Sequence, residues 1–319
     1  MKIRASWVAG VIAAGVISAE VATAGLTAMG GAGADEKAGA QAGQKVDLKP
    51  KFRAGQTATF TQHIVRKDTM KLSMGENTTA DTTVDQTAVY VLRVVDVSDA
   101  ETKLRLEIKS IKASAQLPSG QFEWDSSAPP DDKDEMNPVI KAFRPALNAQ
   151  LELHVNQEGN ITSVVVDERI AAGTRGPLQP FVQQLVGAES VKSRWGSVLW
   201  IKDGSEPAAV GQTWNNRETV SAPPVGRFVV DTTNTLESAK DGLAQIGIKG
   251  KLTLEPLEEG KPKGAELSDP SMSGSCTWDL KAGMVKVYEW KQKFTLEGDA
   301  QGLKFSRVSD LAVTTTRTE

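Results

Sequence analysis

The sequence predicts a mainly β protein with two pseudo-repeated, curved antiparallel sheets, each similar to half of a barrel, and a few packed helices. Three observations lead to this fold class. Short phrases recur in the same order at near-constant spacing. Apolar and polar residues alternate with period two over much of the chain, as in half-buried strands. Only a few segments show helical spacing. The chain has 319 residues, enough for one large domain or two ordinary ones.

The N-terminal segment, residues 1–24, has the pattern of an export signal. Lys2 and Arg4 give it a positively charged start, and the apolar run WVAGVIAAGVISA follows. Small residues then lead to Ala24, which is the predicted cleavage position. We therefore expect an exported protein of the periplasm or cell envelope, for which the membrane is only the export route.

Two alternatives concern the same region. Cleavage could fall at a second group of small residues, 32–34, and the apolar run could be kept as a membrane anchor. Glu20 disfavours the anchor because it interrupts the run before about 20 apolar residues have accumulated. Residues 25–45 are rich in Ala and Gly and are predicted to form a flexible spacer.

Recurring phrases predict an internal duplication. Three pairs of phrases stand in the same order, and the two members of each pair are 156, 148 and 154 residues apart. Such spacing is consistent with two copies of one unit that differ by loop insertions. The pairs are GQTA (55–58) with GQTW (211–214), KLRLE (103–107) with KLTLE (251–255), and GQFEWD (120–125) with GSCTWD (274–279). We expect a first β-rich repeat at 46–168, a helical link at 169–203 and a second β-rich repeat at 204–319.

The strands of the two repeats are predicted from their alternation. In the first, Leu104, Leu106 and Ile108 alternate with charged residues, and the phase changes after Ser110, which indicates a β-bulge. In the second, the apolar residues of 244–254 share one face, and two glycines there would allow bending or close backbone contact. Both copies are therefore predicted to be curved.

Helices are a minority. The segment 134–147 has apolar residues at helical spacing, and Pro145 limits the length of the helix. Two further helical patterns lie between the two repeats, at 177–187 and at 188–200. We expect these helices to pack on the curved sheets or to fill them.

Several function classes find no support in the sequence. The 37 basic and 40 acidic residues nearly balance, whereas a nucleic-acid surface needs clustered positive charge. The chain contains no recognisable hydrolase, metal or phosphate-loop motif. We therefore predict no catalytic residue, no metal ligand and no cofactor, and the binding residues stay unknown.

Five residues carry individual expectations. Cys276 is the single cysteine, so the exported chain has no internal disulfide; a buried, inert thiol is expected, and an intermolecular or reactive role is the alternative. His63 and His154 are expected to be ordinary strand residues. Trp124 and Trp278, in the paired Trp-Asp phrases, are expected to be core anchors rather than a sugar-binding platform.

The sequence resembles a family of exported bacterial proteins, abundant in planctomycetes, whose function is unknown. The similar segments are LKPKFRAGQTATFTQ (48–62), NPVIKAFRPALNAQLELHVNQEGNITSVV (137–165) and PAAVGQTWNNRE (207–218). The resemblance implies a cell-envelope location and a β-rich body, and it supplies no catalytic residues.

Two functions follow as hypotheses. The first is a non-enzymatic binding or scaffold protein of the cell envelope, which in its sharper form carries an apolar small molecule or lipid in the curved sheets. The second is an exported hydrolase whose site is assembled from scattered residues, with His63 and His154 as its material. Oligomeric state cannot be inferred from the sequence.

Overall fold

The computed structural model describes residues 43–73, 77–118, 120–129, 131, 137–166, 186–202, 206–222, 225–257, 264–300 and 303–318. The expected signal, with Ala24, lies outside the described residues, as do nearly all of the spacer and much of the helical link.

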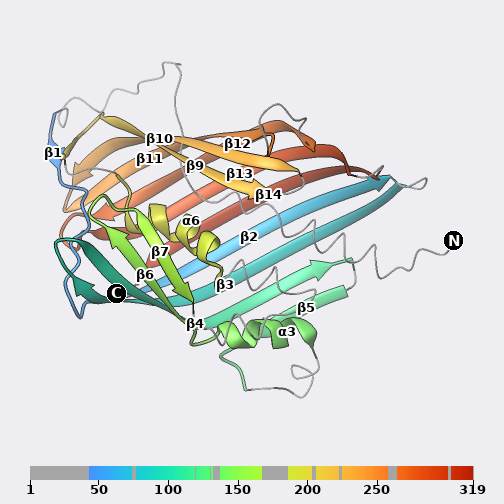
Figure 1. Ribbon diagram of the computed structural model, residues 1–319, viewed down its shortest axis with the longest axis horizontal. Coiled ribbons are helices and arrows are strands. Elements are labelled where there is room, and N and C mark those ends of the chain that lie inside the picture. The colour runs from blue at the N-terminus through green and yellow to red at the C-terminus, as the bar shows by residue number, and fades with distance from the viewer. Residues whose placement is uncertain are drawn as a thin grey trace.

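Strands dominate the described chain, which confirms the predicted mainly β class (Figure 1). The elements before the link are β1 (Lys45–Val46), β2 (Thr57–Ser73), β3 (Asn77–Val97), β4 (Glu101–Leu117), β5 (Gly120–Asp125), α3 (Pro138–Phe143), η1 (Arg144–Ala146), β6 (Gln150–Asn156) and β7 (Ile161–Val166). The later elements are α6 (Ala188–Leu199), β8 (Ala208–Ala209), β9 (Thr213–Ala222), β10 (Gly226–Lys240), β11 (Leu243–Glu255), β12 (Ala265–Asp279), β13 (Met284–Ala300) and β14 (Leu303–Arg317).

One large sheet contains strands of both predicted repeats, a point that the sequence leaves open. Its strand order is β7-β6-β4-β3-β2-β14-β13-β12-β11-β10-β9, with β5 paired to β4 off this path. The junction is β14 with β2, which pair in antiparallel fashion from Lys304 opposite Ser73 to Arg317 opposite Phe60. The last strand of the chain thus joins the first long strand and merges the two halves. A separate two-stranded sheet pairs β1 with β8.

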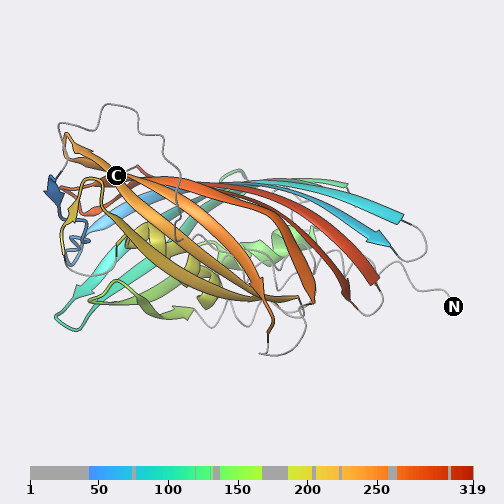
Figure 2. The ribbon, with the colours of Figure 1, turned by 90° about the horizontal axis from the view of Figure 1, so that it is seen from above.

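The large sheet is antiparallel and strongly curved (Figure 2). Successive residues of a strand point to opposite faces, so each long strand has an inner, concave face and an outer face. On β2 the inner face includes the buried Phe60 and Leu72, whereas His63 and Lys67 face outward and are exposed. The half-barrel curvature expected from the sequence is therefore found in one continuous sheet.

Local irregularities fall where the sequence indicates them. Tyr90 of β3 lies opposite Ile108 and Val89 lies opposite Ser110, so Lys109 is the extra residue of a β-bulge in β4. The apolar phase of β4 changes at this bulge, as predicted. In β11, a Cβ at Gly250 would lie 1.9 Å from the Cβ of Met272. Glycine is needed there because β12 approaches β11 closely.

The first Gly-Gln-Thr phrase starts β2 with a defined set of contacts. Gly55 has φ +81°, and its N–H donates to the carbonyl of Val94 at 2.9 Å. The N–H of Val94 in turn donates to the carbonyl of Gln56 at 2.8 Å. The Gln56 side chain accepts a hydrogen bond from the backbone N–H of Arg53 at 3.0 Å through Oε1. The partner strand β3 bulges immediately after Val94.

The second phrase repeats these contacts at the start of β9. Gly211 has φ +90°, and its N–H donates to the carbonyl of Leu236 at 2.7 Å. The N–H of Leu236 donates to the carbonyl of Gln212 at 3.0 Å. Gln212 Oε1 accepts from the N–H of Ala209 at 2.9 Å. Strand β10 bulges immediately after Leu236. The two phrases therefore occupy matching positions in the fold.

The two Lys-Leu phrases do not match in the same way, so their use as a landmark was wrong. Leu104 of β4 lies opposite Val94, and Ile246 of β11 lies opposite Leu236. The first phrase begins one residue before Leu104, whereas the second begins five residues after Ile246. The string recurs because alternating leucine and charge suits any half-buried strand.

The two Trp-Asp phrases also differ in position. Trp124 of β5 lies opposite Ala113, near the far end of β4. Trp278 of β12 lies opposite Ala244, near the start of β11. In the first half, two strands share the edge of β4, because β5 pairs with its second part and β6 with its first. Both tryptophans are buried.

Candidate ligand-binding site on the concave face

Helix α6 lies on the concave side of the sheet, as the helical spacing at 188–200 predicts (Figure 2). The Trp195 ring meets Phe60 of β2 at a centroid distance of 5.4 Å and Tyr90 of β3 at 5.1 Å, both edge to face. Arg194 donates from Nη1 to the Tyr90 hydroxyl at 3.2 Å. These contacts fill the concave face at the end where β2 begins.

The two edge strands approach each other around α6. A hollow of about 330 Å³ is lined by Asn160 and Ile161 beside β7, by Ser193 and Trp200 at the helix, and by Glu218 of β9, among others. Burial raises the pKa of the Glu218 carboxyl, and a hydrogen bond with Ser193 acts in the opposite direction.

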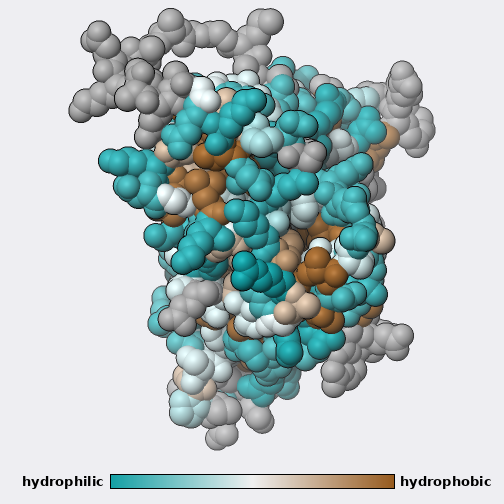
Figure 3. Space-filling model, turned by 90° about the vertical axis from the view of Figure 1, so that its left-hand side faces the viewer, coloured by the Kyte–Doolittle hydropathy of each residue, from teal (hydrophilic) through white to brown (hydrophobic). Residues whose placement is uncertain are grey.

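Seen from this end, hydrophilic side chains cover most of the surface, and hydrophobic ones gather in small areas (Figure 3).

A larger hollow lies at the opposite end of the long strands. Its volume is about 990 Å³, which is in the range of small-molecule sites. Leu72, Ala265 and Phe305 contribute apolar surface. The charged part of the lining projects from the outer face at the strand ends and consists of Lys71, Glu266, Glu297, Asp299 and Lys304.

A glycine shapes this larger hollow. A Cβ at Gly298 would lie 2.8 Å from the Phe305 ring and 2.6 Å from the Gly264 carbonyl. The ring therefore covers Gly298 on the inner face, and any larger residue would displace the ring.

The two ends of the concave face are far apart. Phe60 contacts Trp195 of α6, and Leu72 lies twelve residues farther along β2, which corresponds to about 40 Å of strand.

Between the two ends, the inner face carries buried polar side chains. Gln62 donates from Nε2 to the Thr315 hydroxyl at 3.1 Å. Farther along, Asp68 accepts hydrogen bonds from Arg307 Nε at 3.1 Å and Nη2 at 3.0 Å. Arg66 Nε lies 2.7 Å from the other oxygen of Asp68. We call Arg66, Asp68 and Arg307 the inner charge cluster.

Sequence reasoning missed the inner charge cluster, although a signal for it exists. Within the β2 segment, Arg66 and Asp68 stand in the same phase as Phe60 and Leu72. Charged residues on the apolar phase of a strand are unusual, because burial of charge is costly without partners. Arg307 occupies the corresponding phase of β14, opposite Met70.

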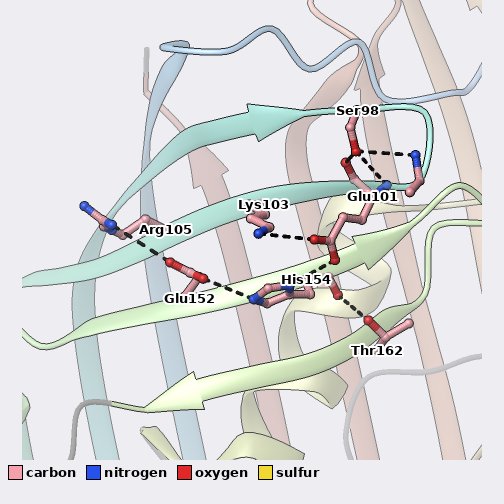
Figure 4. A network of polar contacts seen from close by, with 8 residues as sticks. Ser98, Glu101, Lys103, Arg105, Glu152, His154 and Thr162 are labelled. Carbon is pink, nitrogen blue, oxygen red and sulfur yellow. Dashed lines mark hydrogen bonds and ion pairs between the residues drawn. The ribbon is translucent and has the colours of Figure 1, made fainter.

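The two histidines lie on the outer face, in strands as predicted. His154 Nδ1 lies 2.9 Å from Glu101 Oε2, and Nε2 lies 3.1 Å from Glu152 Oε1 (Figure 4). Lys103 and Arg105 extend this network to the same carboxylates. The hydrogen bond with His154 and the neighbouring Lys103 hold the pKa of Glu101 below its usual value. Both ring nitrogens thus face carboxylates of the same sheet.

The structure does not bring the histidines together. His63 of β2 pairs with Asp85 at 2.9 Å, and two strands separate β2 from β6, which places the histidines about 14 Å apart across the sheet. Following the pairings to β4, His63 aligns with Lys112 and His154 with Lys103. That offset of nine residues adds about 30 Å along the strands.

Cys276 lies on the inner face of β12 and is buried. Burial raises the pKa of its thiol well above the usual value, so the reactive thiolate is disfavoured. Within the described residues, no group of three or more His, Cys, Asp or Glu side chains is placed to hold a metal ion. Among the described helices, none has the length and apolarity needed to cross a membrane.

Comparisons with known proteins place the chain in a family. The model of a family of unknown function, DUF6263, matches residues 99–285. The protein belongs to this family. Its match covers parts of both halves of the large sheet and the whole of α6. A search of curated proteins gives no match.

Two solved structures show how far the likeness of this DUF6263 member extends. A structure of lipovitellin, described under lipid–protein interactions, is 11% identical with a TM-score of 0.47; the match covers 84% of this chain and 26% of that one. DynF, from the dynemicin biosynthesis pathway of Micromonospora chersina, is 7% identical with a TM-score of 0.19, and the match covers 89% and 92%. The chain thus spans about a quarter of the lipovitellin chain, and these scores support no statement about a ligand.

Proposed function

We propose that this protein is an exported, non-enzymatic binding protein of the cell envelope that carries an apolar small molecule or lipid on the concave face of its sheet. The observation that supports this proposal is the unequal filling of that face. Trp195 and its helix fill one end, whereas a hollow of about 990 Å³ lies at the other end of the long strands, where charged side chains of the outer face also line it. The phenyl ring of Phe305 and the side chain of Leu72 supply apolar lining there.

Among the described residues, the outer face does not bring the two histidines together in one site. Its histidines are far apart, and each contacts carboxylates of the same sheet. A hydrolase needs a base within hydrogen-bond reach of the group that it activates, together with positioned partners. The scattered-site hydrolase is therefore not proposed.

The carrier proposal is tested by native mass spectrometry after gentle purification. We expect a fraction of the protein to carry a bound lipid or other apolar molecule, and delipidated protein to take one up again. A bare mass in repeated preparations, with no uptake from lipid vesicles, would contradict the proposal and leave a scaffold role.

A pair of variants locates the bound molecule. Phe305→Asp places a charge on the lining of the larger hollow, and we expect it to reduce ligand occupancy at least severalfold because a buried carboxylate disfavours apolar contacts. Ala312→Asp, on the outer face of the same strand opposite Lys291, is the matched control and should retain ligand. Equal occupancy in the two variants would place the ligand elsewhere.

Export is tested separately by sequencing the N-terminus of the secreted protein. If the signal is removed after Ala24, the mature chain begins at Gly25. A start after the small residues 32–34 would support the second cleavage position, and an intact N-terminus in the membrane fraction would support the anchor.

A further inference from the structure

The smaller hollow beside α6 contains polar atoms without a hydrogen-bond partner. Asn216 and Glu218 of β9 face inward, because they share the less exposed phase of that strand with Trp214. Both residues line the hollow, as does Trp200 at the end of α6. Asn216 Oδ1 and Trp200 Nε1 are buried, and within the described residues neither makes a hydrogen bond. The hollow therefore offers one unpaired acceptor and one unpaired donor.

The hollow is large enough for a small ligand. A buried polar atom without a hydrogen bond costs free energy, so folded proteins leave few such atoms. The volume of about 330 Å³ is roughly ten times that of one water molecule in the liquid, so a single bridging water does not fill the hollow. The volume lies at the lower end of the range for small-molecule sites. Space and unpaired atoms together indicate a small polar ligand.

The lysine and the arginine of the lining already have acidic partners. Lys192 Nζ lies 3.3 Å from Glu189 Oε1. Arg217 Nη1 lies 3.5 Å from Asp231 Oδ1, and Arg217 Nη2 lies 3.3 Å from Glu255 Oε1. An anionic ligand would have to compete with these carboxylates for the two cations. The charge distribution therefore favours a neutral ligand over an anion.

The rest of the lining combines apolar surface with a further polar group. The turn between β6 and β7 lies against the Trp200 ring so closely that a Cβ at Gly159 would collide with the ring. Ile161 adds aliphatic surface. Burial raises the pKa of the Glu218 carboxyl, and a protonated carboxyl donates as well as accepts a hydrogen bond. A ligand of this site thus meets apolar surface and several uncharged polar groups.

We propose that the smaller hollow binds a neutral sugar, whose hydroxyl groups accept a hydrogen bond from Trp200 Nε1 and donate one to Asn216 Oδ1. Each hydroxyl is both a donor and an acceptor, so a small ring that carries several of them can pair with both atoms. An apolar molecule would leave both atoms unpaired. This site lies at the opposite end of the long strands from the larger hollow, so the inference does not depend on the carrier function.

Saturation-transfer difference NMR on the full chain tests the class of ligand. The probes are D-glucose, D-galactose, D-mannose and N-acetyl-D-glucosamine. D-glucuronate serves as the anionic analogue, and cyclohexanol as a six-membered ring with a single hydroxyl. We expect at least one neutral sugar to bind, and to bind more tightly than both analogues by about twofold or more. Tighter binding of either analogue, or no binding of any of the four sugars, would overturn the proposal.

A substitution on α6 tests whether the sugar occupies the hollow. Gly196 lines the hollow, and a Cβ there meets no atom within 4 Å. Gly196→Leu therefore has room for its side chain, replaces a poor helix former with a good one, and should abolish sugar binding by filling the space. Ser190→Leu adds a leucine to the same helix outside the lining and should bind the sugar like wild type.

A second pair of variants tests the hydrogen bond itself. Asn216→Leu removes the acceptor with little change in volume and should weaken sugar binding about two- to tenfold, the range that one hydrogen bond supplies. Asn215→Leu, at the next residue of β9 on the exposed outer face, should retain the wild-type affinity. Wild-type affinity in Gly196→Leu would place the sugar elsewhere, and wild-type affinity in Asn216→Leu would remove the assigned contact; either result overturns the proposal.

Discussion

At the scale of single residues, the informative side chains are ionisable groups on the inner face of the sheet. Glu218 of β9 shares the smaller hollow with α6, and its burial disfavours the charged carboxylate. Asp68 is buried between two arginines at the centre of the sheet. Neither residue belongs to a motif, and each is recognisable only from the strand face on which it lies.

The raised pKa of Glu218 predicts a pH-dependent stability. The folded state holds the proton more tightly than the unfolded chain, so the stabilisation is complete below the usual glutamate pKa and is lost as the pH rises through and above it. Glu218→Gln is neutral at every pH and does not have this loss. The free energy of unfolding of Glu218→Gln minus that of wild type should therefore increase from pH 4 to pH 8.

Urea unfolding across that range measures the difference. Glu158→Gln, at an exposed turn position, controls for the general effect of removing one carboxylate. A Glu218→Gln curve parallel to that of wild type over the whole range would show that burial of Glu218 has no energetic consequence.

At the scale of elements, the two Gly-Gln-Thr strand starts are the most regular feature. In each, a glycine with positive φ turns the chain, and the next residue, a glutamine, accepts a backbone hydrogen bond through its side chain. The partner strand bulges immediately beyond the residue that the glycine contacts. Turn geometry, rather than shared side-chain packing, explains why this phrase appears twice.

Two glycine substitutions test the role of φ. A Cβ at Gly211 meets no atom within 4 Å, so the cost of Gly211→Ala comes from φ +90° alone and should be about 1–2 kcal/mol. Gly196 of α6 also has no atom within 4 Å and has an ordinary helical backbone. Gly196→Ala should therefore stabilise the protein by about 0.5–1 kcal/mol.

Chemical denaturation of both variants provides the measurement, with wild type as the common reference. Gly211→Ala should lower the free energy of unfolding and Gly196→Ala should raise it, although both substitutions add the same methyl group. Stabilisation by Gly211→Ala would contradict the assigned turn.

At the scale of the whole molecule, the pairing of β14 with β2 makes one sheet from two halves. The buried core is likewise one cluster that includes residues of both halves, such as Leu104 and Leu252. Neither half has a complete sheet of its own, because each would expose the strand edge that the other covers. The two halves are therefore coupled energetically.

This coupling predicts a single cooperative unfolding transition. Tryptophan fluorescence, which samples Trp124 in one half and Trp290 in the other, and far-UV circular dichroism should give coincident curves in denaturant. Two separated transitions would show that the halves fold as independent domains.

Much of the fold was predictable, and the candidate site was not. The bulge at Lys109, the buried face of β11 and helix α6 follow from local patterns in the sequence. The duplication into 46–168 and 204–319 stays a prediction, supported by one of its three landmark pairs. Arg66 and Arg307 were overlooked because 241 residues separate them, and no local pattern shows that they share one carboxylate.

By itself, the sequence determined which segments become strands, which face of each strand is buried and where the backbone must turn. These properties depend on neighbouring residues: side chains alternate with period two, and only glycine adopts positive φ without strain. The tertiary structure decided that β14 pairs with β2, that α6 fills one end of the concave face and that two distant arginines meet at Asp68. Such contacts join residues more than a hundred positions apart, so they are selected by the burial of the whole sheet and not by any local pattern.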